Sequence, residues 1–180
     1  IALGVSSSVS IYKACEVLRG FQKQGFDVQV IMTRNATKLI SPLLFASLSG
    51  LRTIVDMYDE PEARSLSHVS LAEEAALLCV APATANVIAK FAAGVADDFL
   101  TTLYLCVRAP VLVAPAMNEA MYLHPTTQAN IGRLKAAGVR FVEPGSGYLA
   151  CGEQGVGRLV EPELIVAEAV KLVTAGRPLQ

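Results

Sequence analysis

The sequence predicts a single-domain α/β fold, in which helices flank a Rossmann-like, doubly wound and mostly parallel sheet. Short apolar runs alternate along the chain with longer segments whose apolar residues recur at helical spacing. This alternation of strands and helices is typical of a parallel sheet. The run at residues 76–81 is apolar at every position, as expected of a strand that helices cover on both faces.

The first strand, helix and second strand are expected at residues 1–5, 10–23 and 28–32. Further strands are expected at residues 53–56, 76–81, 111–114 and 139–142. Further helices are expected to end near residues 49 and 91, and to occupy residues 99–105, 125–137 and 162–173. The stretch at residues 143–158 is rich in glycine, and we expect it to be irregular.

These elements place one domain at residues 1–173 and a tail or linker at residues 174–180. The chain opens inside an apolar run without an initiator methionine, so we expect a few residues to precede Ile1. The linker-like tail allows a synthetase domain to follow Gln180, and the sequence leaves this open.

The composition favours a soluble, self-associating protein. Of the 180 residues, 53% are hydrophobic and 17% charged, and the mean hydropathy is +0.46. A small domain this apolar is expected to bury surface between subunits, with active sites shared between them. The apolar runs are too short to span a bilayer. A net charge of -1 and the lack of a basic run argue against nucleic acid as a partner. No secretory signal pattern is seen, and we expect a cytoplasmic location.

The four cysteines argue against a metal site. None forms a Cys-x-x-Cys pair, and with two histidines in the chain no zinc-ligand spacing exists. Cys15, Cys79 and Cys106 lie in apolar periodic segments and are expected to be buried. Cys151 lies among glycines and polar residues instead. This usage favours a reducing compartment.

Polar side chains follow four of the predicted strands, at residues 6–8, 33–35 and 84–86 and at Asn118. The carboxyl ends of parallel strands share one edge, where ligands of such sheets bind. The three serines could bind a phosphate at a helix N-terminus or simply cap that helix. Without dinucleotide or Walker glycines, a phosphorylated mononucleotide such as FMN fits better than ATP or NAD. Taken alone, Asn118 is expected to cap a short helix between gap-filling methionines.

Six motifs together resemble the flavin-containing cysteine decarboxylase family over nearly the whole chain. They are Ser-Ser-Ser-Val with Tyr-Lys at 6–13, His-Val-Ser-Leu at 68–71, Pro-Ala-Thr-Ala-Asn at 82–86, Ala-Asp-Asp-Phe-Leu-Thr-Thr at 96–102, Pro-Ala-Met-Asn with a further Met at 115–121, and Ala-Cys-Gly-Glu with Gly-Val-Gly-Arg at 150–158. The Asn-Met motif and the Ala-Cys-Gly loop are specific in combination. The members most similar are those that act on phosphopantothenoylcysteine, as the decarboxylase half of a bifunctional bacterial coenzyme A enzyme.

The resemblance implies FMN-dependent oxidative decarboxylation of 4'-phosphopantothenoylcysteine to 4'-phosphopantetheine, in homotrimers or homododecamers. It implies that His68 is catalytic, that Asn118 binds the substrate carboxylate beside Met121, and that Cys151 is a proton donor on a mobile clamp. The implied FMN ligands are Ser7, Ser8, Val9, Thr33, Arg34, Asn35, Thr84, Ala85, Asn86, Val87 and Ala116.

The residue types suit this chemistry. Loss of CO2 needs an electron sink, which the family's flavin creates by oxidising the thiol-bearing carbon to a thioaldehyde. An amide such as Asn118 can donate hydrogen bonds to a carboxylate without opposing its departure, and His68 can transfer protons near neutral pH. Cys151 would protonate the enethiolate as the flavin returns its hydride.

Three departures and two alternatives accompany this resemblance. Ser7 stands where the family usually has glycine, and Asn35 replaces a commoner serine. Glu73 and Glu74 stand where a basic residue often contributes to binding of the substrate phosphate, so the phosphate-binding residue is open. The alternative functions are a peptidyl-cysteine decarboxylase, which would not need Cys151, and a non-catalytic FMN-binding regulator.

Overall fold

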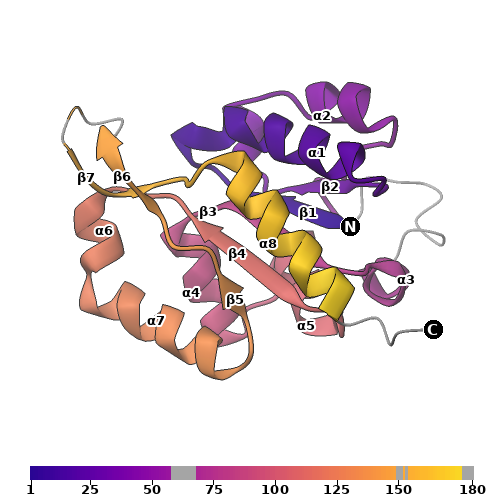
Figure 1. The fold of residues 1–180 in the computed structure, drawn as a ribbon. Helices are drawn as coiled ribbons and strands as arrows, with labels where there is room; N and C mark the ends of the chain where they lie inside the picture. The colour runs from indigo at the N-terminus through magenta and orange to yellow at the C-terminus, as the bar shows by residue number, and fades with distance from the viewer. Residues whose placement is uncertain (58–67, 149–151, 153, 176–180) are drawn as a thin grey trace.

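The computed structural model describes residues 1–57, 68–148, 152 and 154–175. Its centre is a five-stranded sheet in the order β2-β1-β3-β4-β5, with every neighbouring pair parallel (Figure 1). The strands are β1 (Ala2–Val5), β2 (Gln29–Met32), β3 (Leu78–Ala83), β4 (Val111–Pro115) and β5 (Arg140–Phe141). The predicted doubly wound, parallel α/β fold is confirmed.

Helices follow the strands in the expected alternation. They are η1 (Val9–Tyr12), α1 (Lys13–Lys23), η2 (Ala36–Lys38), α2 (Pro42–Ser49), α3 (His68–Glu74), α4 (Ala85–Ala93), α5 (Phe99–Cys106), α6 (Glu119–Leu123), α7 (Pro125–Ala136) and α8 (Pro162–Ala175). Helix α7 begins at Pro125, as predicted, because proline suits the first position of a helix. No helix among the described residues is long and apolar enough to cross a membrane.

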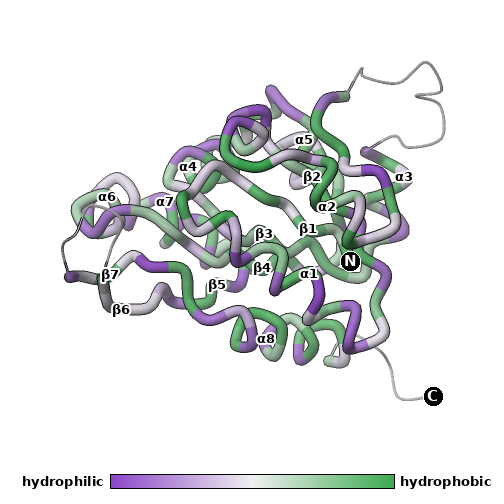
Figure 2. The backbone as a smooth tube through the Cα atoms, turned by 90° about the horizontal axis from the view of Figure 1, so that it is seen from above, coloured by the Kyte–Doolittle hydropathy of each residue, from purple (hydrophilic) through white to green (hydrophobic). Residues whose placement is uncertain are grey.

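Two apolar cores lie on the two faces of the sheet. One contains Leu3, Val30 and Cys79 with residues of α1, α2 and α8, and the other contains Ala2, Ile31 and their neighbours with residues of α4, α5 and α7. The strands split between the cores because successive side chains of a strand point to opposite faces. Figure 2 shows the apolar strands inside the layers of helices.

The glycine-rich stretch departs from the prediction. It forms an antiparallel hairpin of β6 (Gly145–Tyr148) and β7 (Gln154–Arg158) rather than an irregular loop. Gly147 and Gly157 adopt φ values of 152° and 134°, which glycine accepts more readily than other residues. Glycine therefore allows this pair of strands to form and does not prevent strand formation.

Smaller expectations were also wrong. Residues 53–56 form no strand, and Ile54 makes an isolated bridge to Ile31. Cys79 is buried, but Cys15 and Cys106 are half-buried. Burial raises the pKa of the Cys79 thiol to about 12. The last helix continues to Ala175, two residues past the boundary expected for the tail.

Candidate functional site

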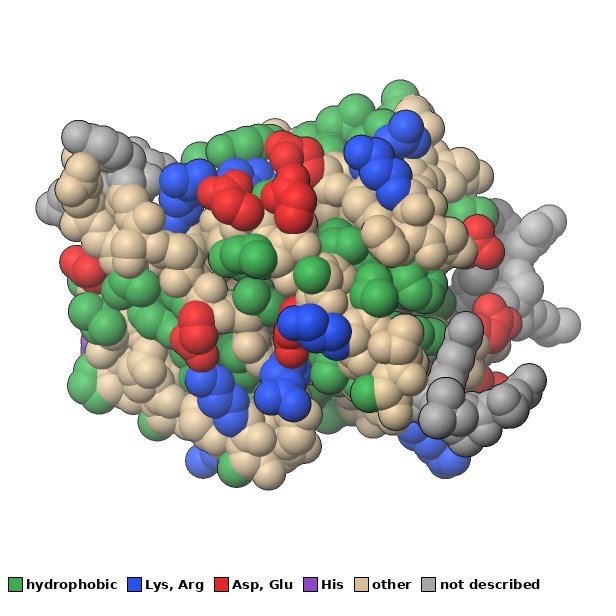
Figure 3. Space-filling view, viewed as in Figure 1, with side chains coloured by type: hydrophobic (Ala, Val, Ile, Leu, Met, Phe, Trp, Pro, Cys, Tyr) green, Lys and Arg blue, Asp and Glu red, His purple; other side chains and the backbone are tan. Residues whose placement is uncertain are grey.

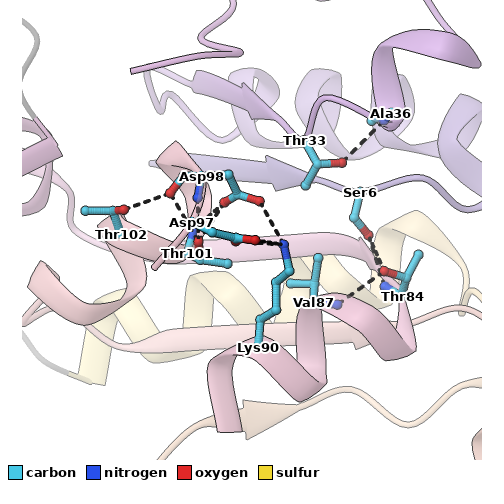
Figure 4. Close-up of polar contacts among 10 residues, drawn as sticks. All are labelled: Ser6, Thr33, Ala36, Thr84, Val87, Lys90, Asp97, Asp98, Thr101 and Thr102. Carbon is cyan, nitrogen blue, oxygen red and sulfur yellow. Dashed lines mark hydrogen bonds and ion pairs between the residues drawn. The ribbon is translucent and has the colours of Figure 1, made fainter. Parts of the chain in front are cut away.

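The polar segments that follow β1, β2 and β3 meet at the carboxyl edge of the sheet, as predicted (Figure 4). Ser6, after β1, donates from Oγ to the carbonyl oxygen of Pro82 at 2.8 Å and accepts from the backbone N–H of Thr84 at 3.0 Å. The backbone N–H of Thr33 donates to the carbonyl oxygen of Val5 at 3.0 Å. These bonds hold the segments side by side.

Two hydroxyl residues of these segments also cap helices. Thr84 caps α4 by accepting from the backbone N–H of Val87. Ser8 caps η1 by accepting from the N–H of Ser10 at 3.4 Å. The capping interpretation of the serine loop is therefore confirmed, and these residues line cavities as well.

Predicted site residues line two cavities, and the larger of these two, which we call the Asn118 cavity, has a volume of about 560 Å³. Seven of the predicted site residues line it: Ser7, Ser8, Val9, Thr84, Ala116, Asn118 and Met121. It joins the serine loop after β1 to the segment after β4. Its wall combines hydroxyl groups with apolar side chains, a lining suited to a small organic ligand with polar ends.

The second cavity, which we call the Asp98 cavity, has a volume of about 300 Å³ and lies against the ends of β1, β2 and β3. The predicted residues that line it are Ser7, Thr33, Arg34, Asn35, Thr84, Asn86 and Val87. Ser7 and Thr84 line both cavities, so the two adjoin. Ala85 begins α4 and is not among the described residues that line either one.

Asn118 has the capping role that its local sequence suggests. Its Oδ1 accepts from the backbone N–H of Ala120 at 2.8 Å, at the start of α6. Because Oδ1 is the capping acceptor, the contact fixes how the amide is oriented at the cavity wall. Met121 is 49% exposed, so it is not the gap-filling core residue expected, whereas Met117 packs against the core.

The hairpin packs directly on the Asn118 segment. The N–H of Met117 donates to the carbonyl oxygen of Gly157 at 2.9 Å, and Oε1 of Glu119 accepts from the N–H of Val156 at 2.9 Å. A Cβ atom at Gly157 would lie 2.3 Å from the carbonyl oxygen of Met117. One at Gly155 would lie 2.6 Å from the carboxylate of Glu119. Position 157 therefore requires glycine, because the obstacle there is backbone, whereas the obstacle at position 155 is the end of a flexible side chain.

Charged side chains are paired differently in the two cavities. In the Asp98 cavity, Arg34 pairs with Asp56, and Nζ of Lys90 lies 2.7 Å from Asp97 and 3.7 Å from Asp98. The hydrogen bond from Lys90 holds the pKa of Asp97 below its ordinary value. Asp98 also caps α5 in a capping box with Thr101, as Figure 4 shows.

In the Asn118 cavity, Lys13 and Arg158 share the carboxylate of Glu161 at 2.8 and 2.7 Å. The hydrogen bond from Lys13 is the main reason that the pKa of Glu161 lies below its ordinary value. In the space-filling view, cationic side chains lie among acidic and apolar groups and form no continuous basic surface on that face (Figure 3).

The structure does not bring His68 to Asn118 within one chain. His68 begins α3, is half-buried and makes an edge contact with the ring of Phe99, at 6.4 Å between centroids. Phe99 lines the Asp98 cavity. In the ribbon of Figure 1 and the backbone tube of Figure 2, α3 and α6 lie on opposite sides of the molecule. Cys151 lies outside the described residues.

Lys13 and Lys90 are cavity residues that the sequence reasoning did not assign to the site. Lys13 follows the serine loop on the buried face of α1, next to the core residue Ala14. A lysine among the apolar positions of an amphipathic helix was the available signal. Lys90 lies one helical turn after the polar cluster at residues 84–86. This spacing was a weaker signal for a site residue.

Known proteins are similar to this chain in sequence and in fold. The family described as Flavoprotein matches residues 1–174. The coenzyme A biosynthesis bifunctional protein CoaBC of Bacillus subtilis (strain 168) is 48% identical over 171 residues, which are 95% of this chain. This chain spans 42% of the length of that relative.

Solved structures agree with this match. A cysteine-to-serine mutant of PPC decarboxylase complexed with pantothenoylaminoethenethiol superposes with a TM-score of 0.84 and 26% identity, over 97% of each chain. The FMN-dependent cysteine decarboxylase SpaF superposes with a TM-score of 0.79 and 29% identity, over 96% of this chain and 95% of that one. The chain belongs to the Flavoprotein family.

Proposed function

We propose that the chain binds FMN and catalyses the oxidative decarboxylation of 4'-phosphopantothenoylcysteine to 4'-phosphopantetheine, a carbon–carbon lyase reaction of coenzyme A biosynthesis. The observation that carries the proposal is the pair of adjoining cavities, which connect a hydroxyl-rich sheet edge to the amide of Asn118. The relatives named above act in the same pathway or on cysteine carboxylates.

The residues around the two cavities fit FMN by their chemistry. Ser7 and Thr84, which line both cavities, offer hydroxyl groups to a phosphate and a ribityl chain. Val9 and Ala116 add apolar wall against which a flat ring can pack. Bound there, FMN would supply reversible two-electron oxidation at the thiol-bearing carbon.

Asn118 would hold the carboxylate that leaves as CO2. Its cap contact to Ala120 places the amide at the wall of the cavity before the substrate arrives. A preoriented neutral donor binds the carboxylate without stabilising it as strongly as a cation would, so the substrate can lose CO2. Met121 would pack beside the substrate, which is consistent with its exposure.

The proton-transfer residues would be His68 and Cys151. Because His68 is far from Asn118 within one chain, we propose that a neighbouring subunit supplies it, in a homotrimer that could assemble further into a homododecamer. Exposed apolar side chains beside the Asn118 cavity, such as Val9 and Tyr12, support an interface there. Cys151, which follows β6 and precedes β7 in the sequence, would protonate the product carbon.

The relatives' names support two wider proposals. A phosphopantothenate–cysteine ligase domain would follow this chain in the full-length protein, because the chain spans 42% of a bifunctional relative. The protein would act in the cytoplasm, where the other steps of coenzyme A biosynthesis would take place.

The visible spectrum of the purified protein tests the function first. We expect flavin absorbance that remains after gel filtration, followed by release of CO2 when 4'-phosphopantothenoylcysteine is added. A regulator would bind FMN but release no CO2, and a peptidyl-cysteine decarboxylase would act on a peptide ending in cysteine instead. A colourless protein that FMN cannot reconstitute would contradict the proposal.

A further inference from the structure

Two cations line the Asn118 cavity and share one carboxylate outside it. Nζ of Lys13 lies 2.8 Å from Oε2 of Glu161, and Nη2 of Arg158 lies 2.7 Å from Oε1 of the same residue. Lys13 is 7% exposed, so its ammonium group is held in a largely desolvated position. Lys13 belongs to α1 and Arg158 to β7. Glu161, just before α8, binds both cations and so connects these two elements.

The charge balance differs between the two cavities. Of the described residues that line the Asn118 cavity, Lys13 and Arg158 are the charged ones, and both are cationic. With Glu161 included, this cluster keeps a net charge of about +1. In the Asp98 cavity two cations, Arg34 and Lys90, face three carboxylates, at Asp56, Asp97 and Asp98. The cationic lining therefore favours an additional anion in the Asn118 cavity.

The chemistry of the cluster matches a phosphate monoester. Lysine binds phosphate as a point charge, and the arginine guanidinium can offer two parallel N–H donors. The hydroxyl groups of Ser8 and Ser10, 3.0 Å apart, line the same cavity and can donate to phosphate oxygens. Glu73 and Glu74 are exposed on α3 and would repel a dianion there.

We infer that Lys13 and Arg158, oriented by Glu161, bind the phosphate group of the substrate while Asn118 binds its carboxylate. The inference rests on the proposed function, because it assumes a ligand that carries an anionic group at each end. Both groups then lie in one cavity of about 560 Å³. FMN is the other phosphate monoester that could use this cluster, and the experiment separates the two.

The test compares 4'-phosphopantetheine with pantetheine as ligands of the FMN-loaded protein, by isothermal titration calorimetry. Lys13→Gln and Arg158→Gln should each weaken binding of the phosphorylated ligand by about 10- to 100-fold, as loss of a charged hydrogen bond does. The affinity for pantetheine should change by less than about threefold. Lys171→Gln, at a residue of α8 that is 73% exposed outside the cavity, is the matched control and should change neither affinity.

Activity supplies the second measurement. The preference in kcat/KM for phosphopantothenoylcysteine over pantothenoylcysteine should fall by a similar factor in both variants. Arg158 is exposed, so Arg158→Gln keeps the test valid if the buried Lys13 proves necessary for folding.

Equal weakening of both ligands, or an unchanged preference for the phosphorylated one, would overturn the inference alone. A loss of FMN affinity in fluorescence titration without a change in ligand preference would assign the cluster to the cofactor and overturn it as well. If the wild-type protein neither binds nor decarboxylates either compound, the proposed function fails and the inference fails with it.

Discussion

Replacing Asn118 by aspartate separates its capping of α6 from its proposed binding of the substrate carboxylate. Aspartate can still cap the helix, but its charge would repel the carboxylate. Aspartate caps helices as well as asparagine does, and a negative charge is favourable at the N-terminus of α6. The contact to the N–H of Ala120 should therefore survive. The substrate carboxylate would instead meet a like charge. At about 4 Å and an effective dielectric constant of about 20, this repulsion is about 4 kcal/mol.

That energy corresponds to a loss of about 10³-fold in kcat/KM for CO2 release. We expect the melting temperature of Asn118→Asp to stay within about 2 °C of the wild type. Asn118→Ser is the matched variant, because it keeps a capping oxygen and loses the amide donors. It should lose about 10- to 100-fold in kcat/KM, since hydrogen bonds to a charged group contribute about 1.5–3 kcal/mol.

Steady-state kinetics and differential scanning calorimetry of both variants are the assay. An Asn118→Asp protein with wild-type kcat/KM would refute the assignment of the amide to the substrate carboxylate. A large fall in melting temperature would refute the claim that the cap and the substrate contact can be separated.

The hairpin and the charged groups give three further predictions. Gly157→Ala should destabilise the fold by about 1–3 kcal/mol in denaturant titration. The φ of residue 157 is 134°, and the added Cβ would meet a backbone carbonyl oxygen. The control Gly132→Ala, on an open helix surface, should not destabilise the fold. Glu119→Ala should speed hydrogen exchange at the N–H of β7 that Glu119 accepts from, whereas Glu119→Gln keeps an acceptor and should not. Lys90→Met should lower the melting temperature slightly at neutral pH, and by progressively less as the pH falls through the depressed pKa of Asp97, because protonation of that carboxyl removes its ion pair; an effect that stays the same as the pH falls would contradict this.

The sheet and its ligand-binding edge could be predicted because both depend on local patterns. Apolar runs such as residues 76–81 form strands, and polar residues directly after them, such as Thr84, must reach the same edge of a parallel sheet. The cap at Asn118 was predictable for the same reason, since it needs only its own neighbours along the chain.

The hairpin and the charge cluster could not be predicted in this way because they depend on contacts distant in sequence. Glycine is required at position 157 by the carbonyl group of Met117, which is distant in sequence, whereas glycine content alone predicted an irregular loop. Lys13 meets Glu161 across 148 positions. The distance between His68 and Asn118 depends on how α3 and α6 are placed around the sheet, which no local pattern determines.

In the proposed reaction, this chain couples FMN to the loss of CO2 from a phosphorylated cysteine conjugate without net oxidation. Mass spectrometry of the product formed from 4'-phosphopantothenoylcysteine under anaerobic conditions tests it most directly. We predict a product that has lost CO2 alone, with many turnovers for each FMN. A product that has also lost two hydrogens, formed once per FMN, would contradict the claim, as would recovery of unchanged substrate.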